Sequence, residues 1–115
     1  MAIKELTPVK AEVNKFTTFA FESATNAEEG FVFKLPRASD EYVSVVASNT
    51  STTPYNITIK APTSGSYAAS LSDETFQLGA NETAILRFES AKWANNDGTV
   101  VLVPANVAVK VNVIY

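Results

Sequence analysis

The sequence contains no histidine and no cysteine. The side chains that suggest chemistry in this chain are therefore carboxylates, amides and aromatic rings. The commonest general base and the triads built on it are therefore excluded, as are disulfides and thiolate zinc sites. Three acidic pairs remain as candidate acids and bases, namely Glu28-Glu29, Asp40-Glu41 and Asp73-Glu74. A glycosidase needs two carboxyl groups facing each other across roughly 5 to 10 Å, whereas adjacent acids on a strand or turn point apart. These pairs lie in or beside predicted turns, so the sequence predicts no catalytic residue.

A run of oxygen-bearing side chains at Asn95-Asn96-Asp97-Gly98 suggests a calcium site, since calcium prefers carboxylate and amide oxygens. The supply of carboxylates is poor, because Asp97 is the only acid in the run and Glu89 stands well before it. Asp-Gly is also a common turn dipeptide, because both residues tolerate positive φ. The turn is therefore favoured over calcium binding, and no metal or cofactor is expected.

Exposed aromatic rings could form a platform on which sugars stack, and the candidates are Tyr42, Tyr55, Tyr67, Trp93 and Tyr115. Most of them occupy inward-facing positions of predicted strands, which favours core packing. Tyr67 is the exception, because it falls in a predicted loop. A carbohydrate-binding or adhesion module of β-sandwich type, with Tyr67 and Trp93 as contact residues, is therefore kept as the alternative function.

Length and charge narrow the choice of partners. The chain has 115 residues, which fits one domain, and a net charge of −3. Its first lysines alternate with glutamates instead of forming a basic stripe, which argues against nucleic-acid binding. No apolar run is long enough for a signal peptide or a membrane span. The sequence therefore predicts neither a nucleic-acid nor a membrane partner, and synthesis in a cytoplasm.

Alternation of apolar and polar residues predicts a chain made almost entirely of β-strands. The clearest strand is 55–60, with Tyr55 and two isoleucines on one face and polar residues on the other. The stretch 99–103 is apolar on both faces, which predicts a central strand. Other predicted strands cover 16–21, 31–35, 42–48, 71–78, 84–89 and 107–114.

Two connections between these strands are predicted to be hairpins. Strands 42–48 and 55–60, with the polar loop between them, have the pattern of one antiparallel pair. The glycine-led turn 79–82 is expected to join 71–78 to the strand that follows. Turns every 8 to 12 residues or so are typical of a sandwich or barrel. The prediction is an all-β, single-domain antiparallel β-sandwich, immunoglobulin-like in layout, with about eight strands.

The N-terminal residues 1–12 mix charge with Ile3, Leu6 and Val9, and Pro8 interrupts any helix. Two interpretations stay open for them, a tethering arm and a plain edge strand. The sandwich domain is expected to cover 13–115.

From residue 42 onward the chain resembles the small head decoration proteins of tailed bacteriophages. The shared pattern starts with V-S-V-V-A-S-N at 43–49, a strand ending in asparagine, and the I-T-I-K strand at 57–60. It continues with G-A-x-x-T-A at 79–84 and with E-S-x-x-aromatic at 89–93. A Gly-x-Val strand at 98–100 and an alternating valine terminus complete it.

This resemblance implies a non-enzymatic virion structural protein that binds the outside of an assembled capsid and stabilises it. The implied partner is the lattice of the major capsid protein, and the implied location is the capsid exterior after synthesis in the bacterial host cytoplasm. Self-association, as a trimer or a monomer on the lattice, stays open. The resemblance transfers no individual site residue. From the composition of the N-terminal segment, the expected capsid contacts are Ile3, Lys4, Leu6, Val9 and Lys10.

Overall fold

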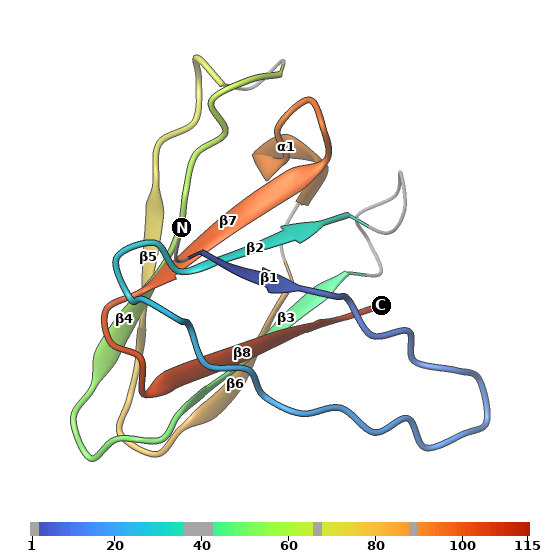
Figure 1. The fold of residues 1–115 in the computed structure, drawn as a ribbon, viewed down its shortest axis with the longest axis vertical. Coiled ribbons are helices and arrows are strands. Elements are labelled where there is room, and N and C mark those ends of the chain that lie inside the picture. Colours follow the sequence, from blue (N-terminus) through green and yellow to red (C-terminus); the bar gives the residue numbers. More distant parts are fainter. Residues whose placement is uncertain (1–2, 36–42, 66–67, 88–89) are drawn as a thin grey trace.

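Two β-sheets make up the protein, which a computed structural model describes for residues 3–35, 43–65, 68–87 and 90–115 (Figure 1). The larger sheet has the strand order β1 (Lys4–Leu6), β2 (Phe31–Lys34), β7 (Thr99–Pro104), β4 (Tyr55–Ile59) and β5 (Glu74–Leu78). The smaller sheet has the order β6 (Thr83–Arg87), β3 (Ser44–Asn49) and β8 (Val109–Ile114). A one-turn helix, α1 (Ser90–Trp93), precedes β7. The predicted all-β, single-domain β-sandwich of about eight strands is confirmed.

The core lies between the two sheets and follows from the period of two along each strand. In β8, Val109, Val111 and Val113 are completely buried, and in β2 the rings of Phe31 and Phe33 face them across the sandwich core. Each such side chain contributes about 1.5–3 kcal/mol when it leaves water. The strand predicted to be central is confirmed as β7, which lies between β2 and β4.

The inward and outward faces of β4 are confirmed as well, with Ile57 and Ile59 buried and the polar residues more exposed. The final strand begins at Val109 rather than at Val107, which is exposed in the preceding turn. One strand pair departs from the antiparallel expectation, because β1 runs parallel to β2. The other named strand pairs are antiparallel.

Both predicted hairpins are wrong. β3 pairs with β6 and β8, whereas β4 pairs with β5 and β7, so the polar loop after Asn49 crosses from one sheet to the other. The turn Gly79–Glu82 likewise connects β5 in the larger sheet to β6 in the smaller one. Alternation determines which face a residue occupies but not which strand lies beside it, so the pattern could not distinguish a hairpin from a crossing.

The buried side chain of Asn49 ties the two crossings together. Its amide nitrogen donates to the carbonyl oxygens of Thr53, Leu78 and Gly79, at 2.9, 3.2 and 3.2 Å. Its amide oxygen accepts from the backbone N–H of Ser51 at 3.0 Å. The asparagine at the end of V-S-V-V-A-S-N thus satisfies the backbone of both connections at one corner of the sandwich.

The predicted strand at 16–21 is also wrong. Between β1 and β2 the chain makes only single-residue bridges, from Val9 to Ile114 and from Glu22 to Val111. The segment between those bridges leaves the sandwich and returns to it, at the lower right of Figure 1. Residues 10–21 are called the projecting loop below.

Candidate functional site

Both ends of the projecting loop are held on β8 and the residue that follows it. At the outgoing end, the N–H of Val9 donates to Val113 O at 2.8 Å and that of Ala11 donates to Tyr115 O at 2.6 Å. At the returning end, Glu22 exchanges two backbone hydrogen bonds with Val111, at 2.8 and 3.0 Å. These contacts place the loop in a defined direction on the sandwich rather than leaving it as a free tail.

Side-chain contacts add to this anchoring. The buried amide of Asn112 donates to the carbonyl oxygen of Ala20 at 2.7 Å. The ammonium of Lys4 pairs with the carboxylate of Glu22 at 3.6 Å, a surface contact worth at most about 1 kcal/mol. The rings of Phe19 and Phe21 meet edge to face with centroids 5.5 Å apart.

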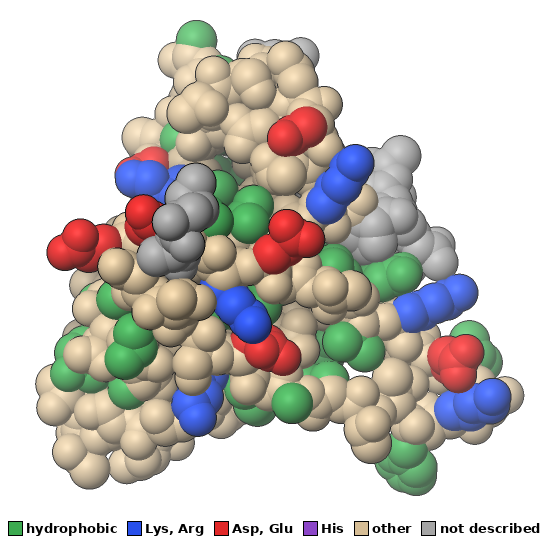
Figure 2. Space-filling model, in the orientation of Figure 1, with side chains coloured by type: hydrophobic (Ala, Val, Ile, Leu, Met, Phe, Trp, Pro, Cys, Tyr) green, Lys and Arg blue, Asp and Glu red, His purple; other side chains and the backbone are tan. Residues whose placement is uncertain are grey.

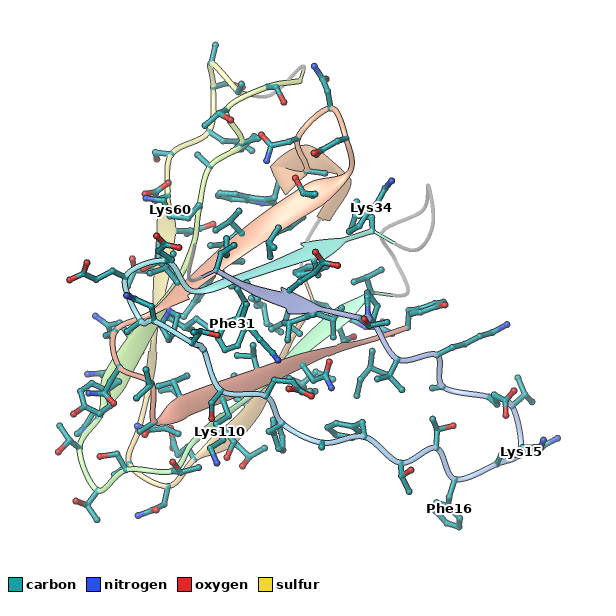
Figure 3. All side chains as sticks on the ribbon, in the orientation of Figure 1. Lys15, Phe16, Phe31, Lys34, Lys60 and Lys110 are labelled. Carbon is teal, nitrogen blue, oxygen red and sulfur yellow. The ribbon has the colours of Figure 1, made fainter. Side chains whose placement is uncertain are left out.

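The tip of the projecting loop presents apolar side chains to solvent. Val13 is 85% exposed, Phe16 is fully exposed and Phe19 is 42% exposed. Figure 3 shows Phe16 pointing away from the sandwich beside Lys15, and Figure 2 shows hydrophobic atoms at the same corner next to charged ones. Nothing in the described chain covers these rings and methyl groups. An ordered segment with this surface is the strongest candidate for an interaction site.

The structure shows where the expected capsid contacts of the N-terminal segment lie. The residues expected to contact a capsid were Ile3, Lys4, Leu6, Val9 and Lys10. Leu6 is buried in the core, so its side chain is not on the surface. Ile3, Lys4 and Val9 are half-buried and belong to β1 or its flanks, and Lys10 is exposed where the projecting loop begins. Capsid contact by the four accessible residues stays a prediction.

The sequence pattern did not identify Val13 and Phe16 as surface residues. The alternation of Phe19 and Phe21 suggested a strand, but Phe16 falls outside that alternation and follows Asn14, which adopts a positive φ of 60°. An asparagine next to a lysine, just before an isolated phenylalanine, is the signal of a turn that could have identified the tip.

A second apolar surface lies where the sandwich is open between β5 and β6, which are edge strands of different sheets. It is a slot with a volume of about 180 Å³, lined mainly by Val45, Ile57, Phe76, Leu78, Ala84 and Leu86. Ile85, on β6 at its rim, is 67% exposed, and Phe76 is partly exposed. The core is therefore accessible from one side between these strands.

The Asn95–Gly98 run forms a turn, as the sequence favoured, although it joins α1 to β7 rather than two strands. The carboxamide oxygen of Asn95 is already occupied, because it accepts hydrogen bonds from the backbone and hydroxyl groups of Thr63 and Ser64. The backbone of Gly98 donates to Asn95 O at 2.8 Å. The run attaches the loop after β4 to the start of β7.

The acidic candidates of the sequence do not form a metal-binding cluster among the residues that the structure describes. No group of three or more acidic side chains converges on one point within the described ranges. The Asp73 carboxylate pairs with Lys60 at 2.6 Å, and Glu28 lies in a turn where its N–H donates to Asn26. Asp40-Glu41 lies outside the described residues.

The aromatic candidates for sugar stacking either pack in the core or lie outside the described residues. Trp93, at the end of α1, is only 8% exposed and packs in the core. Tyr55 and Tyr115 pack against the same core, and Tyr42 and Tyr67 lie outside the described residues. The carbohydrate-binding interpretation therefore loses Trp93 as a contact residue.

Asp97 supplies a testable titration. The hydroxyl and then the backbone N–H of Thr99 donate to its carboxylate, at 2.6 and 3.1 Å, and hold the pKa of Asp97 below its ordinary value of 3.8. A lowered folded-state pKa means that this stabilisation is present above pH 3.8 and is lost as the pH falls through the folded-state pKa. In Thr99→Val the pKa of Asp97 is expected to move back up towards 3.8, as measured by NMR titration of the carboxyl carbon. Equal midpoints in the two proteins would contradict this account.

Comparison with known proteins found no match for the chain. No protein-family model matches it, and neither a curated protein nor a solved structure does. Within the described ranges, no helix is both long and apolar enough to cross a membrane.

Proposed function

We propose that the protein is a non-enzymatic structural component of a phage particle that binds the outer surface of the assembled capsid and stabilises it. Two observations support the proposal: the motif resemblance to head decoration proteins from residue 42 onward, and the projecting loop. The observation that carries it is Phe16, a fully exposed ring on a loop that β8 holds in place. A large apolar side chain held in water on an ordered segment favours a binding role.

The energetics suit binding to a shell. A ligand that binds only the assembled lattice stabilises that lattice by mass action, and each bound copy adds its contribution. Burial of a side chain such as Val13 or Phe16 contributes about 1.5–3 kcal/mol. A few such contacts on each copy are enough when many copies bind one particle.

The proposal is tested by mixing the purified protein with heads that lack it, assembled from the major capsid protein of the same phage, and sedimenting them. The protein is expected to co-sediment at micromolar concentration with assembled heads and to stay in the supernatant with unassembled capsid subunits. Absence of the protein from the head pellet would refute the proposal.

The role of the projecting loop in this binding is tested by Val13→Ser combined with Phe16→Ser. Affinity for heads is expected to fall tenfold or more, because two apolar side chains are lost and each tenfold change corresponds to about 1.4 kcal/mol. The matched control is Val107→Ser, which removes an exposed valine from the β7–β8 turn. Equal affinities for the loop variant and the control would place the contact elsewhere.

A further inference from the structure

The projecting loop and the apolar slot are the two main uncovered apolar features of the described chain, and they lie at different corners of the molecule. In Figure 1 the loop extends to the lower right, whereas β5, which forms one side of the slot, runs along the left edge. The loop is fixed in its direction by the hydrogen bonds to β8 and its C-terminal neighbour. Phe16 therefore cannot enter the slot of its own chain.

We propose that Phe16 of one copy inserts into the slot between β5 and β6 of a second copy. This pairing goes beyond the proposed function, because it concerns copies of the chain that are not bound to a capsid. One Phe16 ring occupies either the slot of a second copy or a site on the capsid. The size of the slot matches the ring. An apolar cavity of about 150 Å³ holds a benzene molecule, and the slot has a volume of about 180 Å³.

The charges around the two features are complementary. Residues 10–21 contain two lysines and one glutamate, a net charge of +1, whereas β5, β6 and the turn between them (74–87) contain two glutamates and one arginine, a net charge of −1. Lys15 directly precedes Phe16 at the exposed tip. Side chains of alternate residues in a strand point to the same face. Glu74 therefore lies on the face of β5 that carries Phe76 and Leu78, which line the slot. Insertion of the ring brings the lysine to an acidic rim.

The buried area predicts a weak contact in solution. An aromatic side chain buries about 150–250 Å², whereas a stable interface needs about 800 Å² on each partner. Because the loop and the slot are different surfaces, the contact is head-to-tail and produces rings or open chains rather than a closed two-fold dimer.

Covalent trapping suits a weak contact, and the chain contains no native cysteine to interfere. Thr18→Cys, an exposed position that keeps the Phe16 ring, is mixed with Ile85→Cys, at the rim of the slot, under mild oxidation. Disulfide formation between these two variants is expected to be at least tenfold faster than between Thr18→Cys and Thr52→Cys, an exposed position in the β3–β4 loop. Equal rates with Ile85→Cys and Thr52→Cys would overturn the pairing.

Competition supplies a second measurement that does not depend on how well each cysteine variant reacts. An excess of the wild-type chain is expected to slow trapping more than an excess of Phe16→Ser, because only the wild-type ring occupies the slot of the trapped variant. If both competitors act alike, the slot does not bind the ring. Failure of either measurement leaves the head-binding test unaffected, since that test uses the wild-type protein and intact heads.

Discussion

Replacement of Gly30 by alanine is expected to lower the free energy of unfolding by about 4 kcal/mol or more, which is exceptional for one methyl group. Gly30 precedes β2 with a positive φ of 69° and is buried. A Cβ atom there would lie 2.1 Å from the carbonyl oxygen of Leu102 and 2.9 Å from the Cα of Val103. Both are backbone atoms of β7 and cannot rotate away.

Movement of that backbone would disturb the pairing of β2 with β7, where Phe31 lies opposite Leu102. It would also disturb the hydrogen bonds that Gly30 makes with Asn26 and Lys4, each 2.9 Å long. A domain of this kind has only about 5–15 kcal/mol of stability in total, so the substitution is expected to remove a large fraction of it.

The measurement is urea unfolding followed by circular dichroism, with Gly98→Ala as the matched control. Gly98 also has a positive φ, of 84°, but its nearest neighbours are side-chain carbons of Lys34 at 3.6 and 3.7 Å. The control therefore bears only the backbone strain of about 1–2 kcal/mol. Similar losses in the two variants would mean that the contact with Leu102 is not what excludes a side chain at Gly30.

Replacement of Asn49 by alanine is expected to cost about 3 kcal/mol. The amide nitrogen donates to carbonyl groups of Thr53, Leu78 and Gly79, and the bond to Leu78 is buried. A buried polar group left without its partner costs about 1–3 kcal/mol, and this substitution affects more than one. Asn49→Asp should be at least as damaging, because it turns a donor into a charged acceptor facing carbonyl oxygens.

Asn106→Ala is the control for Asn49. The carboxamide oxygen of Asn106 accepts one hydrogen bond, from the N–H of Ala108 at 2.9 Å, in a half-buried turn. Its loss is expected to cost about 1 kcal/mol. If chemical unfolding gives the same loss for both asparagine variants, the corner that Asn49 holds is not a major source of stability.

The strands could be located from the sequence because their period of two is strong where one face is buried. The run of valines in β8 and the isoleucines of β4 determine which side meets the core. Partner choice could not be found in this way, since Asn49 and Gly79 belong to connections that look like hairpins and cross between sheets. Those crossings depend on hydrogen bonds between residues about thirty positions apart, which no local pattern reveals.

The candidate site was harder to predict, because no sequence pattern distinguishes its residues from those of strands or of the core. Aromatic residues such as Phe16, Phe19 and Phe21 are typical of strands. Phe16 and Phe19 are exposed because their segment pairs with no strand. The slot has no sequence signature at all, because its walls are ordinary core residues such as Val45 and Leu86. It exists because β5 and β6, joined by a tight turn, are edge strands of different sheets.

The anchoring of the projecting loop on β8 has a consequence for synthesis of the chain. The loop leaves the ribosome before its backbone partners Val111, Val113 and Tyr115. Nascent chains therefore expose residues 10–21 without a fixed shape until those partners emerge, since domains can complete their folding only when all strands are available. Phe16 is therefore held in its exposed position only after β8 has been synthesised. Incomplete chains lack the ordered tip with which a finished copy could associate.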